Sequence, residues 1–172
     1  MKTLLLFCAF CISIGCGLNT IPYSVETTSQ EPNEAAQSHY KWGLTYAKNG
    51  DHVQAISEFK LAIQNEPGWA LPYYNLGAVY GNMGELYEAI LAWERTTQLD
   101  PNFAKAYYNL AIGYSSRAED KYGKDIEKAI FSLHEAIRLD KTTVASAKIE
   151  PAFDRLRNLP EFRKLVLTTK EK

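Results

Sequence analysis

The sequence predicts an all-α protein in which three similar helix hairpins follow one another and further short helices cover the last of them. Amphipathic runs at helical spacing come in pairs, separated by short breaks, and the pattern of large, small and breaking residues recurs at a constant spacing along the chain. No stretch combines strand-like alternation with hairpin turns. The composition, 46% hydrophobic and 23% charged, is that of an ordinary globular domain, and 172 residues suit one such domain.

The stretch from residue 70 to residue 101 shows the hairpin most clearly. Each of its two runs places four residues on one helical face, namely Tyr73, Leu76, Gly77 and Tyr80 and then Leu86, Ala89, Ile90 and Trp93. A break at residues 82–85 separates the runs. Pro101 ends the unit, because proline cannot donate the hydrogen bond that a continuing helix needs.

The same hairpin recurs on both sides of this stretch. Gly43 stands one period before Gly77, and the matching positions on that side are Trp42, Tyr46, Ala55, Phe59 and Pro67. On the other side Leu110, Ala111 and Tyr114 follow in register, whereas Ala129 and Leu133 arrive six residues late. We therefore expect helix pairs at residues 33–48 and 53–65, 70–82 and 86–99, and 103–117 and 125–139.

A 34-residue period with this pattern resembles the tetratricopeptide repeat (TPR). The resemblance covers about residues 36–143 and implies a right-handed α-solenoid whose repeats span residues 36–69, 70–103 and 104–143. The small residues have a physical role, because two helices approach closely only where a side chain is tiny. We expect close approach at Gly43, Gly77 and Ala111, with large residues filling the gaps beside them: Trp42, Leu76, Leu110, Phe59, Trp93 and Leu133.

Residues 144–172 are predicted to cap the last apolar face, which a solenoid cannot leave open. Val144 and Ala147 indicate one short helix, and Pro151 suits the first turn of another. Phe153, Leu156 and Leu159 form an apolar stripe that continues after Pro160. This stripe is similar to the C-terminal caps of many bacterial TPR proteins.

The segment from Met1 to Gly15 is typical of an export signal. Lys2 precedes an apolar run at residues 4–14, which is shorter than the about 20 residues that a membrane-spanning helix needs. Gly15-Cys16 after this run resembles the lipobox of bacterial lipoproteins, although Ser13 stands where that motif usually has leucine. The resemblance implies cleavage before Cys16 and a lipid on Cys16; an uncleaved anchor, a secreted form and cysteines serving only as small hydrophobic residues are the alternatives. Polar residues 16–32 then form a flexible tether, and no cysteine follows.

The TPR resemblance implies a concave groove lined by the first helix of each repeat, where the family commonly binds peptides or helices. The groove positions predicted here are Tyr40, Lys41, Tyr74, Asn75, Lys105, Tyr108 and Asn109. Tyrosine rings beside amides suit a peptide, but the same residues are also the common filling of these positions and shape the hairpin itself. A mildly basic groove would favour an acidic segment or a C-terminal carboxylate; lysines that are merely scattered and solvated are the alternative. Only Asn75 and Lys105 match the five positions at which one TPR subfamily clamps a terminal carboxylate, so no such clamp is expected.

No pattern points to catalysis. The histidines His39, His52 and His134 have no metal-ligand spacing, and the sequence has neither a phosphate-binding loop nor a nucleophile elbow. A net charge of −1 gives no signal for nucleic-acid binding. We expect no enzyme, cofactor, metal or small-molecule substrate. The sequence predicts a TPR adaptor tethered by lipid to a bacterial envelope membrane, on the outer membrane or periplasmic face, with an unidentified protein partner; a secreted or periplasmic form and a solenoid that only self-associates are the alternatives.

Overall fold

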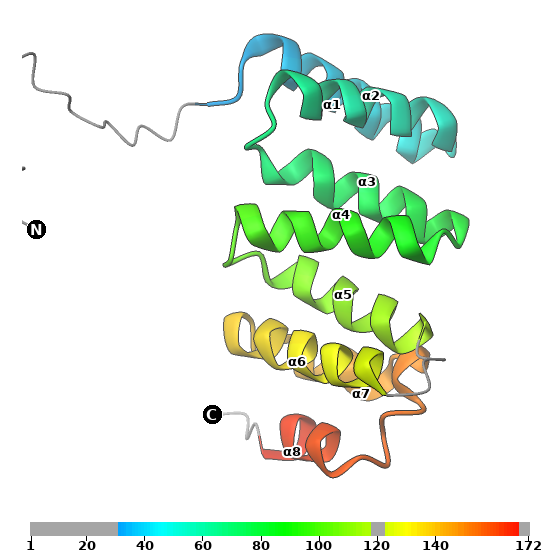
Figure 1. Ribbon diagram of the computed structural model, residues 1–172, viewed down its shortest axis with the longest axis vertical. Helices are drawn as coiled ribbons and strands as arrows, with labels where there is room; N and C mark the ends of the chain where they lie inside the picture. Colours follow the sequence, from blue (N-terminus) through cyan, green and yellow to red (C-terminus); the bar gives the residue numbers. More distant parts are fainter. Residues whose placement is uncertain (1–30, 118–122, 169–172) are drawn as a thin grey trace, which may run out of the picture. The chain divides into compact units, whose positions relative to one another are not determined.

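The computed structural model describes residues 31–117 and 123–168. Pro32–Lys172 forms one compact unit. Within the described residues the structure is helical, with three hairpins stacked one after another (Figure 1). They are α1 (Glu34–Asn49) with α2 (His52–Asn65), α3 (Ala70–Met83) with α4 (Leu86–Leu99), and α5 (Ala104–Arg117) with α6 (Lys124–Leu139). These bounds confirm the predicted helix pairs to within about two residues.

Two glycines make the tight turns inside the first two hairpins. Gly50 and Gly84 have φ values of 84° and 81°, in the left-handed region that side-chain-bearing residues avoid. The backbone N–H of each glycine bonds back to carbonyls of the last helical turn. Each turn therefore satisfies groups that the end of a helix leaves unpaired and sends the chain straight into the second helix.

Each hairpin closes where a first helix lacks a side chain, as predicted. A Cβ atom at Gly43 would lie 2.6 Å from the Phe59 ring, and one at Gly77 would lie 2.5 Å from Trp93 Nε1. Phe59 is fully buried, and Trp93 donates a hydrogen bond from Nε1 to the carbonyl of Tyr74 at 3.2 Å. Missing atoms on one helix and large rings on the other thus fix the packing.

Trp42 does not fill a gap, contrary to the prediction. Its side chain is 56% exposed, whereas Leu76 and Leu110, at the matching positions of the next hairpins, are buried. The reason is its place in the stack. The first helices α3 and α5 contact the second helix of the hairpin before them, whereas α1 has no such helix before it among the described residues.

The C-terminal segment closes the other end through α7 (Thr143–Ile149), a 3₁₀ turn η1 (Pro151–Phe153) and α8 (Pro160–Thr168). Pro151 starts this single turn rather than the full helix that the sequence suggested. Phe153 and Leu156 are completely buried, and Phe162 and Val166 are buried beside them in the core cluster that includes Leu133. The apolar stripe thus covers the last hairpin, as expected.

Candidate functional site

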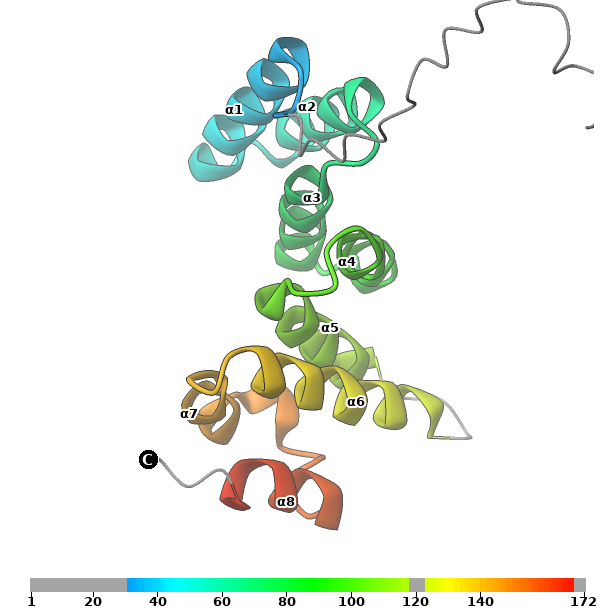
Figure 2. The ribbon, with the colours of Figure 1, turned by 90° about the vertical axis from the view of Figure 1, so that its left-hand side faces the viewer.

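The predicted groove residues all lie on the first helices of the three hairpins. In Figure 2, α1 and α3 lie to the left of α2 and α4, and α5 continues the series of first helices. Residues three or four apart share one side of a helix. This spacing joins the predicted residues and two more into one surface, which we call the first-helix face: Tyr40, Lys41 and Leu44 on α1, Leu71, Tyr74 and Asn75 on α3, and Lys105, Tyr108 and Asn109 on α5.

Tyr40 joins the first hairpin to the second. Its half-buried ring lies 5.9 Å from the Phe59 ring and 4.6 Å from the Trp69 ring, measured between centroids. Asn75 donates hydrogen bonds from Nδ2 to the Tyr40 hydroxyl and to the Leu71 carbonyl, each at 3.0 Å. Both residues therefore hold neighbouring hairpins together, whatever else they contact.

The arrangement repeats one hairpin further on and then changes at the end. Tyr74 packs on Phe103 with ring centroids 4.8 Å apart, and Asn109 bonds to its hydroxyl. Tyr108 instead meets Phe153 edge-on at 5.9 Å. Phe153 comes from the C-terminal cap, so it supplies the ring that the start of a further repeat would have supplied.

Burial raises the pKa of Tyr40, Tyr74 and Tyr108 above the ordinary value of 10.0. The amide hydrogen bonds from Asn75 and Asn109 act in the opposite direction on the pKa of Tyr40 and Tyr74, but burial is the larger effect. The three hydroxyls therefore stay neutral at physiological pH. The charged members of the first-helix face are Lys41 and Lys105, and the nearby Glu150 carboxylate raises the pKa of Tyr108 further.

The side chains free to meet another molecule on this face are exposed leucines and lysines. Leu44 is 39% exposed and Leu71 is 37% exposed, and Lys41 and Lys105 are also exposed. Sequence reasoning did not assign the two leucines to the predicted groove. Their spacing of four residues from Tyr40 and three from Tyr74 would have identified them.

The first helices are also electrostatically distinct from the second helices. Helices α1, α3 and α5 together carry four basic residues and one acidic residue, and α3 has no charged residue. Helices α2, α4 and α6 carry five basic and six acidic residues. This count covers the whole helices; on the first-helix face itself the charged residues are Lys41 and Lys105.

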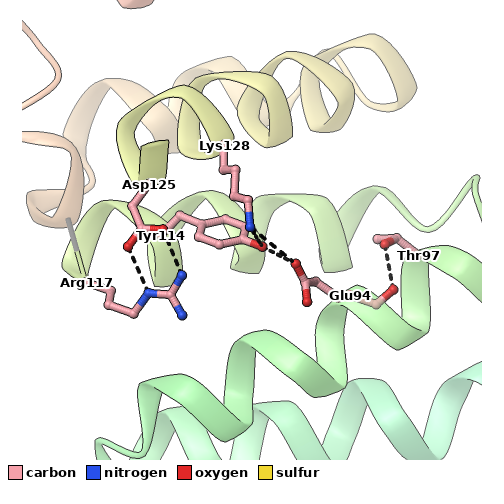
Figure 3. A network of polar contacts seen from close by, with 6 residues as sticks. All are labelled: Glu94, Thr97, Tyr114, Arg117, Asp125 and Lys128. Carbon is pink, nitrogen blue, oxygen red and sulfur yellow. Dashed lines mark hydrogen bonds and ion pairs between the residues drawn. The ribbon is translucent and has the colours of Figure 1, made fainter. Parts of the chain in front are cut away.

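A polar network that the sequence did not reveal joins the second and third hairpins (Figure 3). Tyr114 is almost fully buried and donates a hydrogen bond from its hydroxyl to Glu94. The Lys128 ammonium lies 4.9 Å from the centre of the Tyr114 ring and 4.0 Å from a Glu94 oxygen. Burial, followed by the contact with Glu94, raises the pKa of Tyr114 strongly. The phenol therefore remains a hydrogen-bond donor rather than an acid or a base.

The same network includes a two-pronged ion pair within the third hairpin. Arg117 donates from Nε and Nη2 to the two Asp125 oxygens at 2.9 and 2.7 Å, and its guanidinium carbon lies 5.3 Å from the Tyr114 ring centre. The hydrogen bonds from Arg117 lower the pKa of the Asp125 carboxyl. The network stabilises the packing of α4, α5 and α6 and presents no nucleophile or metal ligand set.

The predicted lipid-bearing residue, Cys16, lies outside the described residues, as do the export signal and most of the tether. Within residues 31–117 and 123–168, no cluster of three or more histidine, cysteine, aspartate or glutamate residues could hold a metal ion. No helix in these same ranges has the length and apolarity that crossing a membrane would require.

Comparison with known proteins supports the repeat assignment. Two family models described as tetratricopeptide repeat match residues 70–103 and 37–68, the second and first hairpins. No curated protein sequence matches the chain.

Solved structures with the same fold include MamA, which is 26% identical over 79% of this chain and 76% of that chain, with a TM-score of 0.64. The Arabidopsis OM64 TPR domain is 18% identical over 67% of this chain and 93% of its own, with a TM-score of 0.59. The first TPR of Spaghetti (RPAP3), solved with the HSP90 peptide SRMEEVD, is 16% identical over 71% of this chain and 93% of its own, with a TM-score of 0.62. The first two hairpins of this chain are thus tetratricopeptide repeats, and its all-helical stack has the fold of these TPR structures.

Proposed function

We propose that this protein is an adaptor that binds an extended or helical segment of another protein on its first-helix face. The observation that carries the proposal is the pairing of exposed Leu44 and Leu71 with exposed Lys41 and Lys105, beside tyrosines that already pack within the protein. Exposed apolar side chains give a partner area to cover, and the lysines give it charge to match.

The preferred segment is acidic and carries an apolar side chain. Helices α1, α3 and α5 have an excess of basic residues, although the whole chain has a net charge of −1. The related fold in RPAP3 supports this class of ligand, because its peptide SRMEEVD has three acidic side chains. Asn75 contributes little as an amide donor, since its Nδ2 already bonds to Tyr40 and to Leu71. The leucines and lysines therefore provide most of the binding.

Peptide display tests this proposal. The immobilised full-length protein would select from a library of random peptides, and we expect the selected peptides to be enriched in aspartate and glutamate. The Lys41→Glu/Lys105→Glu variant should lose these peptides, and added salt should weaken their binding to the wild type.

A second variant controls for the change in net charge. Lys60→Glu/Arg95→Glu makes the same charge change on the second helices α2 and α4 and should retain the selected peptides. Selection without acidic enrichment, or equal losses in the two variants, would contradict the proposed ligand class.

The proposed location of the adaptor is a bacterial envelope membrane, with Cys16 as the lipid-bearing residue and residues 16–32 as the tether. The Gly15-Cys16 pair behind an apolar run supports this proposal. Growth with a labelled fatty acid should label the wild type but not Cys16→Ala, and only the wild type should remain with membranes. A Cys16→Ala protein that is still labelled would show that another residue carries the lipid.

A further inference from the structure

An open groove of about 960 Å³ lies between α6 and α8, at the C-terminal end of the stack and apart from the first-helix face. Its apolar lining comes from Ile130, Phe131 and Ile137 on α6 and from Leu159 and Leu165 in and beside α8. Phe131 is 62% exposed, whereas Leu133 and Ile137 on the same helix are buried. An aromatic ring left in water beside an apolar groove marks a surface that another molecule covers.

The charges of this groove are arranged along its length. Helices α6 and α8 are in contact and run in the same general direction (Figures 1 and 2). Glu127 lines the groove near the start of α6, and Glu161 lines it near the start of α8. Arg138 lies near the end of α6, and Lys141 lies two residues beyond the last residue of that helix. Both line the groove at the end of α6 opposite to Glu127. His134 and Lys164 line the part between them.

When two copies of the groove are placed antiparallel, the acidic end of one lies beside the basic end of the other. Glu127 and Lys141 lie seven residues before and seven residues after His134. A two-fold axis passing close to His134 would therefore place Glu127 of one copy beside Lys141 of the other, twice in the same contact. Arg138 already pairs with Glu135 at 2.9 Å, so Lys141 is the cation available to Glu127.

We propose that a second copy of this chain covers the groove, with α6 antiparallel to α6 of the partner copy. Each Phe131 enters the groove of the other copy, and the Glu127–Lys141 pairs fix the register. Two-fold contacts of this kind are the commonest form of self-association. This inference is independent of the proposed function, because the groove shares no residue with the first-helix face.

The size of the surface sets the strength of the contact. Helix α6 has 16 residues, so its length is about 24 Å, and two helices side by side present a face about 20 Å wide. Such a face is at the small end of specific protein interfaces. We therefore expect dissociation in the micromolar range rather than a permanent dimer.

Sedimentation equilibrium of the full-length protein in density-matched detergent tests the surface. Phe131→Glu should weaken dimerisation at least roughly tenfold, since a carboxylate would enter an apolar groove. Trp42→Glu is the matched control, because Trp42 is also an exposed aromatic residue but lies on α1 at the opposite end of the stack. Trp42→Glu should dimerise like the wild type. A wild type that stays monomeric at several hundred micromolar, or a dimer that only Trp42→Glu disrupts, would overturn the proposal.

Mixing two charge variants tests the antiparallel register. Glu127→Lys and Lys141→Glu should each weaken self-association roughly tenfold, because each places two like-charged pairs in the contact. A mixed dimer of the two variants has only opposite-charged pairs and should regain wild-type strength. Differently tagged variants should therefore capture each other better than themselves. Capture of the mixed partner no better than of the same variant would exclude this register, and with it the proposed dimer.

Discussion

Asn75 on α3 donates a hydrogen bond to the hydroxyl of Tyr40 on α1, with 3.0 Å between the donor nitrogen and the acceptor oxygen. The two residues are 35 positions apart in the chain and belong to different hairpins. Asn109 stands at the matching position one hairpin later and acts to lower the pKa of the Tyr74 hydroxyl. The residues that first suggest a peptide-binding row are thus also the links between repeats, so variants on this face need controls for stability.

The Tyr40–Asn75 link predicts a measurable coupling. Tyr40→Phe and Asn75→Ala should each reduce the free energy of unfolding, and a double-mutant cycle should give a coupling of about 0.5–1.5 kcal/mol, the net worth of one hydrogen bond. Tyr46→Phe is the control, since no hydrogen bond of the Tyr46 hydroxyl is found among the described residues. Urea unfolding followed by circular dichroism measures the free energy of unfolding of all five proteins, the control included. Additive effects of the two substitutions would mean that the bond does not contribute.

The contact of Gly77 with Trp93 predicts a position that tolerates no side chain. Gly77→Ala would place a Cβ atom 2.5 Å from Trp93 Nε1 and push the indole away from the Tyr74 carbonyl. We expect a loss of about 1–3 kcal/mol through overpacking, despite the better helix propensity of alanine. Gly68→Ala meets nothing within 4 Å and should change stability by less than about 0.5 kcal/mol. Equal thermal stability of the two variants would mean that Trp93 does not pack on Gly77.

The burial of Phe153 predicts how much the C-terminal cap contributes to the free energy of unfolding. Phe153→Ala should cost about 3–5 kcal/mol, because the ring is fully buried between Tyr108 and Phe162. Phe131→Ala removes the same group from an exposed site and should cost far less in the monomer. Hydrogen exchange should also show faster opening of α5 in the Phe153 variant, because η1 packs on that helix. Unchanged protection of α5 would show that the cap does not support the third hairpin.

The Arg117–Asp125 ion pair should contribute to the free energy of unfolding in a way that acid removes. Because Arg117 lowers the pKa of Asp125 below its ordinary value of 3.8, the pair stabilises the fold fully above pH 3.8. This contribution is lost as the pH falls through the lowered pKa of the folded state. Arg117 is 32% exposed, so solvent screens the pair and its worth is about 1 kcal/mol. Asp125→Asn should therefore be less stable than wild type at pH 7, and urea unfolding should show this difference shrinking below pH 3.8. A constant difference across that range would exclude the assignment.

The repeat architecture could be predicted from the sequence because its signals are local and repeated. Glycine at the close approach, a large ring opposite it, and a proline after the second helix recur together in the first two units. Residues such as Trp42 could not be assigned in this way. The repeat pattern at Trp42 is the same as at Leu76, and only the position at the end of the stack leaves Trp42 exposed.

The residues of the first-helix face could be found from the sequence, but their contacts could not. The periodicity found the tyrosines and asparagines, since they recur at matching positions of successive repeats. It could not show that their hydroxyls and amides already bond to each other, because those bonds join residues from different hairpins. Leu44 and Leu71 could not be found by periodicity, because they do not recur at matching positions. The network around Tyr114 could not be predicted either, because its residues come from different helices that only the fold brings together.

The central claim, that the first-helix face binds another protein, is tested most directly by photocrosslinking in the cell. A photoreactive amino acid replaces Leu71 on this face or, as the matched control, Leu91, an exposed leucine on the second helix α4. We predict that position 71 forms an adduct with another protein and that Lys41→Glu/Lys105→Glu abolishes it, while position 91 forms none. An adduct from position 91 but not from position 71 would contradict the claim.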